Sequence, residues 1–146
     1  MIVGNKRNTD AFIFDSNVLV YMFDRQVPGK QYTAAELVQQ DVDADRALLS
    51  TQVLQEIYNV GTVKLKIPLP KDQAEQVVQK FSKLPVRQVD TAIIMAAIYR
   101  NRVDKISFWD ALIIEAALAG GASILWSEDL QHGRIFDGLE VKNPFQ

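Results

Sequence analysis

An apolar run that ends in an acid, within Ala11–Tyr21, constrains the fold of this chain most strongly. Ala11–Phe14 is apolar and holds two aromatic side chains; Asp15, Ser16 and Asn17 follow, and the hydrophobic spacing then changes. A run of this length followed by small polar residues predicts a buried strand that turns directly into a helix. Open α/β proteins bind ligands where parallel strands end, so we expect Asp15 to be either a helix N-cap or a ligand-binding acid.

Segments typical of strands and of helices alternate along the rest of the chain. Strands are predicted at 46–50, 85–89, 122–126 and 139–141, the last as an edge strand, and helices at 18–23, 32–42, 51–65, 72–84, 91–102 and 108–119. This alternation predicts a three-layer α/β/α fold around a central, mainly parallel sheet of four to five strands. We find no internal repeat and no linker-like tract, so residues 1–146 are expected to form a single domain.

Composition excludes several classes of protein. The chain is 48% hydrophobic and 23% charged, as in ordinary globular proteins, and it has no cysteine, which is compatible with the cytoplasmic location we expect. The polar segment Met1–Asp10 lacks the apolar core of a secretory signal, and no run approaches the ~20 apolar residues of a membrane span. A net charge of −2 argues against coating nucleic acid by a positive field, although bound cations invert the local sign.

Two acids lie among apolar residues of predicted helices. Glu56 lies beside the apolar stripe of its helix, and on sequence alone it is a boundary acid at the rim of the core. Asp110 lies in a segment that is apolar nearly all round, where a charge needs a partner or a metal. Three residues after Ser107, Asp110 also fits a first-turn acid that the helix dipole favours, and both interpretations hold together.

A fourth acidic position repeats the layout around Asp15. The apolar run 122–126 is followed by Ser127, Glu128 and Asp129, and either acid can face a ligand or cap the turn. Parallel topology brings the carboxyl ends of strands to one sheet edge, so we expect these acids to converge. Converging carboxylates need cations, and all-oxygen ligation suits Mg²⁺ or Mn²⁺. Zinc is disfavoured, because the single histidine, His132, lies in a turn that we expect to be exposed.

An ordered set of motifs spans nearly the whole chain. It comprises Phe14-Asp15-Ser16-Asn17-Val18-Leu19, Gln55-Glu56, Ser107-Phe108-Trp109-Asp110-Ala111-Leu112-Ile113 and Ser127-Glu128-Asp129-Leu130. In order and spacing these motifs resemble the PIN-domain nucleases, and most closely the VapC-type toxins of prokaryotic toxin–antitoxin modules.

The resemblance implies a metal-dependent endoribonuclease that hydrolyses RNA phosphodiester bonds with Mg²⁺ or Mn²⁺. Its catalytic acids match Asp15, Glu56, Asp110 and Asp129, of which Asp15, Asp110 and Asp129 are the expected metal ligands. Asn17, Ser127 and Glu128 are expected to orient those acids from behind. Glu128 departs from the family pattern, because many relatives carry a basic or neutral residue there, and this leaves open whether Glu128 or Asp129 faces the site.

The resemblance also implies partners. A protein antitoxin and a homodimer are expected. The helices predicted at 32–42 and 72–84 carry more apolar residues than a small sheet covers, and we expect partners to cover the rest. Basic residues near the acids are candidate phosphate contacts, although each taken alone is better explained as a solvated surface charge; they are Arg25, Lys30, Lys64, Lys66 and Arg134.

Two other functions fit parts of the pattern. A phosphatase with Asp15 as nucleophile would resemble the haloacid dehalogenases, but these carry a second aspartate where this chain has Asn17. A non-catalytic RNA- or protein-binding module would use the same acids structurally. Substitution of Asp15 by alanine separates this binding module from the nuclease. Loss of a helix cap lowers stability, whereas loss of a metal ligand abolishes activity.

Overall fold

The computed structural model describes residues 10–146, so the predicted polar segment before Asp10 lies outside the described residues. The strands are β1 (Ala11–Phe14), β2 (Ala47–Ser50), β3 (Val86–Arg87), β4 (Ala122–Trp126), β5 (Ile135–Phe136) and β6 (Leu139–Lys142). The α-helices are α1 (Ser16–Val20), α2 (Pro28–Asp43), α3 (Thr51–Asn59), α4 (Lys71–Phe81), α5 (Thr91–Asp104) and α6 (Phe108–Ala119). A 3₁₀ turn, η2 (Tyr21–Phe23), extends α1, and a π-helical turn, η3 (Val60–Lys64), extends α3.

The strands form one sheet in the order β3-β2-β1-β4-β6-β5. Every neighbouring pair is parallel except β5 and β6, which confirms the predicted α/β class and its mainly parallel sheet. Within residues 10–146 the sheet has six strands rather than four to five, because the unpredicted two-residue strand β5 is also hydrogen-bonded into it.

The prediction that residues 139–141 form an edge strand is wrong. β6 lies between β4 and β5, and β5 occupies the edge. Asp137 and Gly138 connect β5 to β6 with φ angles of 52° and 93°, the positive values that a two-residue hairpin turn requires. Asp-Gly is a hairpin signal, but the two-residue strand before it is too short to show periodicity.

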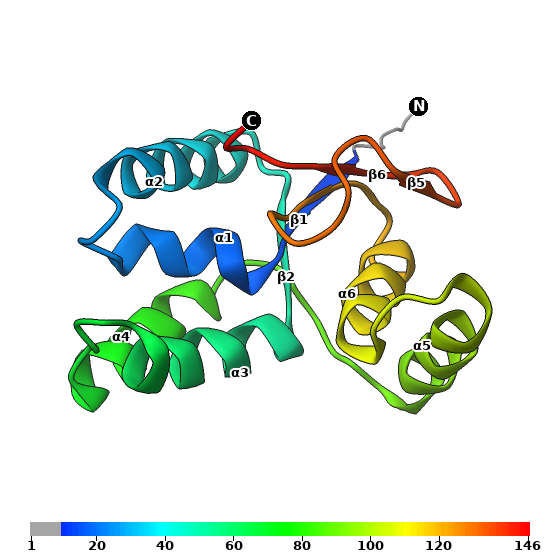
Figure 1. Cartoon of the computed structure of the whole chain (residues 1–146), viewed down its shortest axis with the longest axis horizontal. Coiled ribbons are helices and arrows are strands. Elements are labelled where there is room, and N and C mark those ends of the chain that lie inside the picture. Colours follow the sequence, from blue (N-terminus) through cyan, green and yellow to red (C-terminus); the bar gives the residue numbers. More distant parts are fainter. Residues whose placement is uncertain (1–9) are drawn as a thin grey trace.

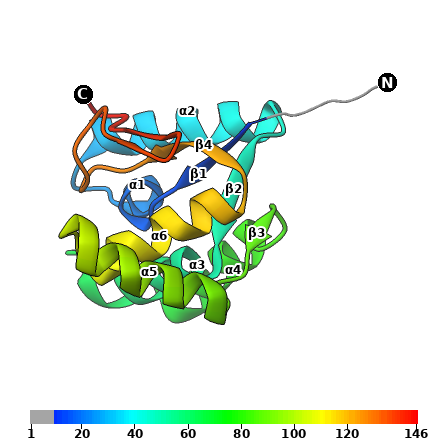
Figure 2. The same cartoon turned by 90° about the vertical axis from the view of Figure 1, so that its right-hand side faces the viewer.

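Helices cover both faces of the sheet. Figure 2 shows α2 on one side and α3, α5 and α6 on the other, and Figure 1 shows the pairs α1/α2, α3/α4 and α5/α6 around the central strands. All four residues of β2 are buried, as expected for a parallel strand covered on both faces. Among residues 10–146, no helix combines the length and the apolar character needed to cross a membrane.

Polar side chains begin four of the helices where the sequence predicts them. The N-caps are Asp15 for α1, Ser50 for α3, Asp90 for α5 and Ser107 for α6, each accepting a hydrogen bond from a backbone N–H of its helix. Three of these helices follow directly from, or close to, the carboxyl end of a parallel strand. The caps therefore point the beginnings of α1, α3 and α5 toward one edge of the sheet.

Candidate active site

Asp15 lies where β1 ends and α1 begins. Its backbone is extended (φ −74°, ψ 153°), and its Oδ1 accepts a 2.8 Å hydrogen bond from the N–H of Ser16. Its own N–H donates to the carbonyl of Trp126 over 2.9 Å, so the pairing of β1 with β4 continues to this residue. The carboxylate is therefore located between the carboxyl ends of two central strands, the position where α/β proteins bind ligands.

The second oxygen of Asp15 is held by the segment that follows β4. Oδ2 accepts hydrogen bonds from the hydroxyl of Ser127 (2.8 Å) and from Nδ2 of Asn17 (3.3 Å). Oδ1 of Asn17 accepts from the N–H of Glu128 over 3.2 Å, which ties the beginning of α1 to the turn after β4. Asn17 and Ser127 thus both contact the Asp15 carboxylate directly.

Burial leaves Asp15 with an unusual carboxylate. Its side chain is nearly inaccessible, and burial is the main cause that raises the pKa from 3.8 to about 7. Hydrogen bonds from Ser127 and Ser16 lower the pKa, whereas the negative charges of Glu56 and Asp129 raise it further. Its electrostatic surroundings are thus hydrogen-bond donors and two further acids, and a positive charge there would stabilise the ionised form.

Asp110 is the third residue of α6 and is half-buried. Its N–H donates to the Ser107 hydroxyl over 3.0 Å, which confirms the predicted helix beginning. Burial raises the pKa of Asp110, Ser107 lowers it, and the charge of Asp129 raises it further. The charge of Asp129 therefore acts on both Asp15 and Asp110.

Glu56 reaches the cluster from α3, and its helix is held against the beginning of α6. The charge of Glu56 acts on Asp15. One helical turn earlier, the buried Gln52 donates from Nε2 to the carbonyl of Trp109 over 3.2 Å. Gln52 therefore fixes the helix of Glu56 relative to the helix of Asp110. Sequence reasoning missed this residue, although its spacing of four from Glu56 places both on one helix face.

Glu128 and Asp129, the two consecutive acids after β4, have different neighbours. The N–H of Asp129 donates to the Ser127 hydroxyl over 3.2 Å, and its carboxylate charge acts on the cluster. The Glu128 carboxylate instead accepts a 2.6 Å hydrogen bond from the Tyr21 hydroxyl and forms an ion pair with Lys30. In this arrangement Asp129, and not Glu128, faces Asp15.

A pocket of about 320 Å³ opens beside the cluster. Its lining residues come from α1, η2, η3 and the loops that follow η2 and β4: Ser16, Asn17, Val20, Tyr21, Asp24, Val60 and Asp129. Asp24 is an acid that sequence reasoning did not select, because it follows a short 3₁₀ turn and its Oδ1 accepts from the N–H of Gln26 like an ordinary turn residue. A larger pocket of about 560 Å³ lies between α3 and α4, lined by Leu54, Gln55, Tyr58, Glu75, Val78, Gln79 and Ser82.

The donor chemistry of the cluster matches a hard divalent cation. Carboxylate oxygens suit Mg²⁺ and Mn²⁺, and Asp15 has the raised pKa of a buried acid near other acids. Across residues 10–146, however, no three acidic or histidine side chains lie close enough together to coordinate one ion as they stand. The acids act on one another through their charges, and the residues fit the cation by chemistry rather than by a ready coordination shell.

The fold, with acids at the carboxyl ends of its parallel strands, is that of a known class of protein. A model of the PIN domain matches residues 12–136, which is most of the chain. The chain therefore belongs to the PIN domain family. Among curated proteins, none matches the sequence at a significant level.

Several solved structures share the fold. A DNA-bound VapBC structure from Salmonella typhimurium is 18% identical, with a TM-score of 0.65 over 93% of this chain and 99% of that one. The toxin VapC20 from Mycobacterium tuberculosis, described as cleaving the sarcin-ricin loop, is 16% identical, with a TM-score of 0.64 over 82% and 90%. VapBC2 from Rickettsia felis bound to a promoter DNA fragment is 21% identical, with a TM-score of 0.61 over 91% and 98%. At these identities the likeness shows the fold.

Proposed function

We propose that this protein is a metal-dependent endoribonuclease and the toxin of a toxin–antitoxin pair. The observation that carries the proposal is the convergence of acids from four distant parts of the chain: Glu56 and Asp129 both act on the buried Asp15, and Asp129 also acts on Asp110. The match to the PIN domain and the shared fold with VapC structures support it.

Each acid has a part in the proposed site. Asp15, Asp110 and Asp129 hold Mg²⁺ or Mn²⁺, and Glu56 completes the site directly or through water. Such an ion lowers the pKa of bound water and stabilises charge on the phosphate in hydrolysis. Ser127 and Asn17 hold the orientation of the Asp15 carboxylate through its Oδ2. The carboxylates supply no positive charge of their own, so the phosphate of RNA meets a favourable field only once cations have bound.

A mechanism that uses histidines and the 2′-hydroxyl of RNA does not fit this chain. Such a mechanism employs a general acid and a general base, commonly two histidines. The chain has one histidine, and its Nδ1 accepts a 2.9 Å hydrogen bond from the N–H of Asn143 in an exposed turn. Attack by water on the phosphate gives 5′-phosphate and 3′-hydroxyl ends, whereas attack by the 2′-hydroxyl gives a 2′,3′-cyclic phosphate.

Cleavage of a defined RNA with analysis of the ends tests the proposal. We expect cleavage with Mg²⁺ or Mn²⁺, loss of cleavage in EDTA, restoration when the ion is returned, and 5′-phosphate products. A matched variant, Asp15→Asn, should retain the fold and lose cleavage. Cleavage that persists in EDTA, or cyclic phosphate ends, would overturn the metal mechanism, and absence of cleavage under all conditions would favour a binding module.

A protein antitoxin is the proposed regulatory partner. Two structures that share the fold are VapBC complexes on DNA, one from Salmonella typhimurium and one from Rickettsia felis. By analogy we place this chain in the cytoplasm with a DNA-binding antitoxin. Copurification of the chain with the product of a neighbouring gene, and loss of cleavage in that complex, would test this partner.

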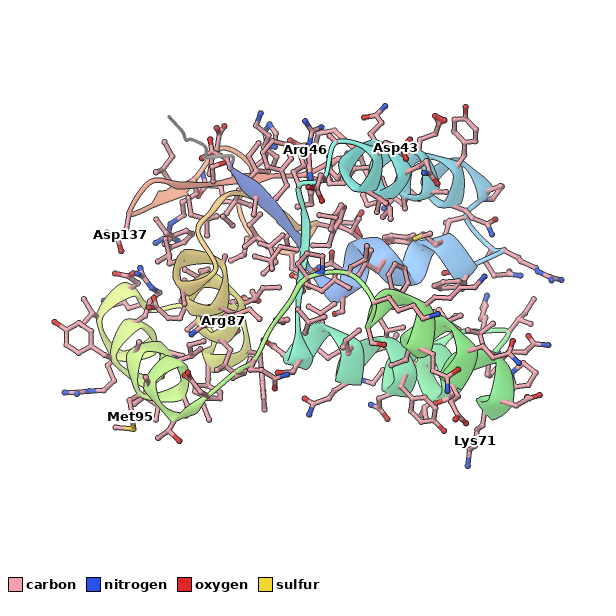
Figure 3. All side chains as sticks on the ribbon, turned by 180° about the vertical axis from the view of Figure 1, so that it is seen from behind. Asp43, Arg46, Lys71, Arg87, Met95 and Asp137 are labelled. Carbon is pink, nitrogen blue, oxygen red and sulfur yellow. The ribbon has the colours of Figure 1, made fainter. Side chains whose placement is uncertain are left out.

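A second copy of the chain is the proposed partner for α5. Ile93 and Ala97 of this helix are buried, yet its outward face is also apolar, with Met95 60% and Tyr99 64% exposed. Figure 3 shows Met95 projecting away from the molecule. The same face also carries Ile94, Ile98 and Val103. This surplus of apolar surface lies on α5 and not, as the sequence suggested, mainly on the helices at 32–42 and 72–84.

The charges at the two ends of α5 favour pairing with an identical helix. Asp90 precedes the first turn and Arg102 lies in the last turn, and both are exposed. Antiparallel pairing about a two-fold axis brings Asp90 of each copy toward Arg102 of the other and also opposes the two helix dipoles. We therefore propose that α5 forms the centre of a homodimer.

A further inference from the structure

Glu128 lies in a cluster of side chains outside the group of acids. Its carboxylate accepts a 2.6 Å hydrogen bond from the Tyr21 hydroxyl and is ion-paired with Lys30. The Lys30 ammonium also lies 4.9 Å from the centre of the Tyr21 ring and 5.2 Å from that of Phe145. Tyr21 and Phe145 pack edge to face at 5.1 Å. Four residues from α2, η2, the turn after β4 and the C-terminal segment thus form one contact group.

We propose that Lys30 is a positioning residue of the active site: together with Tyr21 it holds Glu128 away from the acid cluster, so that Asp129 faces Asp15 and Asp110. The inference rests on the proposed nuclease function.

The turn that holds Glu128 and Asp129 is hydrogen-bonded to the acid cluster through its backbone. The N–H of Glu128 donates to Asn17, whose amide contacts Asp15, and the N–H of Asp129 donates to Ser127. The turn is thus attached to the cluster by its backbone, while Glu128 is attached to Lys30 by its side chain. Because the two acids are adjacent, loss of the Lys30 contact would leave a second carboxylate within reach of the same site.

The ion pair with Lys30 also separates the charge of Glu128 from the charges of the acid cluster. The charge of the Glu128 carboxylate is balanced by the ammonium of Lys30, its ion-pair partner. Without Lys30, a fifth negative charge would stand beside the cluster. It would repel the RNA backbone and would offer cations one more carboxylate.

A double-mutant cycle on cleavage of a short RNA tests the inference. We expect Lys30→Met to raise KM about tenfold with a much smaller change in kcat, whereas Lys30→Arg should stay close to the wild type. In Lys30→Met/Glu128→Gln, the unbalanced charge is absent, so KM should return to near the wild-type value. Lys71→Met is the matched control for loss of one positive charge, because Lys71 projects into solvent from the beginning of α4 (Figure 3).

A titration of Mn²⁺ into the protein without RNA gives a second readout. Lys30→Met should bind Mn²⁺ more tightly or bind an additional ion, and the Glu128→Gln change should reverse this. Tyr21→Phe, which removes one hydroxyl, should change KM and Mn²⁺ binding in the same directions as Lys30→Met but by smaller amounts. It replaces Lys30→Met in both experiments if that variant does not fold.

Each other outcome has a defined meaning. If the double variant remains as impaired as Lys30→Met, Lys30 contacts RNA itself and the inference is wrong. If Lys30→Met matches the wild type in KM and in Mn²⁺ binding, the cluster is structural and the inference is equally wrong. If the wild type cleaves no RNA, the proposed function fails, and the Mn²⁺ titration still decides whether Lys30 controls Glu128.

Discussion

The hydroxyl of Ser127 donates a 2.8 Å hydrogen bond to Oδ2 of Asp15, joining the residue after β4 to the residue after β1. Both residues are buried, and the two strands are neighbours in the centre of the sheet. The bond lowers the pKa of Asp15 and thus opposes the effect of burial. The same hydroxyl accepts a hydrogen bond from the N–H of Asp129 and so holds the turn that carries this acid. Ser127 therefore couples the charge of one acid to the position of another.

Ser127→Ala should raise the pKa of Asp15 above its value of about 7, because the variant removes a hydrogen bond to the ionised form. Titration of the aspartate side-chain carbons by NMR, in EDTA, measures this shift. Ser50→Ala is the matched control, since Ser50 is equally buried and caps α3. We expect the control to lose about 1 kcal/mol of stability and to leave the Asp15 titration unchanged.

Asp15→Asn should stabilise the protein at neutral pH. The folded pKa of about 7 exceeds the ordinary 3.8, so the folded state binds the proton more tightly. The associated stability is fully present below pH 3.8 and is lost as pH rises toward 7. The loss is at most on the order of 4 kcal/mol.

Urea unfolding in EDTA at several pH values checks this expectation. The advantage of Asp15→Asn over the wild type should grow between about pH 4 and pH 8, because the amide keeps the acceptor for Ser16 and carries no charge. A difference that stays constant over this range would show that Asp15 is not held in the protonated form.

The sequence predicted the elements that carry this site because their signals are local. A strand ending in Asp15, the cap at Ser107 and the acid at Asp110 each depend on neighbours a few residues away, and the structure has all three as predicted. The parallel topology then placed distant acids at one edge. What the sequence did not reveal depends on contacts across the fold, such as the hydrogen bond from Gln52 to the Trp109 carbonyl and the ion pair between Lys30 and Glu128.

Helix α3 shows another limit of the local pattern. The apolar spacing predicted one helix to residue 65, whereas α3 ends at Asn59 and continues as the π-helical turn η3. The N–H of Leu65 donates to the carbonyl of Val60, and that of Leu69 donates to the carbonyl of the buried Gly61. Leu69, on the chain that returns after η3, therefore bonds a carbonyl that a regular helix would have used, and side-chain periodicity does not predict such a bond.

Met95→Glu should convert the proposed homodimer into a monomer, because the charge would lie at the centre of the outward face of α5. Light scattering after size-exclusion chromatography measures the mass in solution. Val63→Glu is the matched control, since Val63 is 66% exposed on η3 and outside that face. A wild-type protein that is monomeric at high concentration, or a Met95→Glu variant that stays dimeric, would contradict the assignment.

Arg100→Met should destabilise the fold while leaving the acid cluster intact. Arg100 is ion-paired with Asp104 and Asp137, both at distances below 3 Å, and with Glu115, so it joins α5, α6 and the β5–β6 hairpin. Its side chain is 14% exposed, and its removal leaves the partly buried carboxylates of Glu115 and Asp104 without their cation. We expect a loss of about 2–4 kcal/mol in urea unfolding. Mn²⁺ binding should be unchanged, and a loss of binding would place Arg100 closer to the site than the structure does.

The central claim, that acids from four parts of the chain form one cation site, is tested most directly by titrating Mn²⁺ into the protein and counting bound ions by electron paramagnetic resonance. We predict saturable binding to the wild type that is weakened separately by Asp15→Asn, Glu56→Gln, Asp110→Asn and Asp129→Asn. Asp72→Asn, at an exposed acid in the first turn of α4, should bind like the wild type. Absence of saturable binding to the wild type, or four variants that bind as tightly as the control, would contradict the claim.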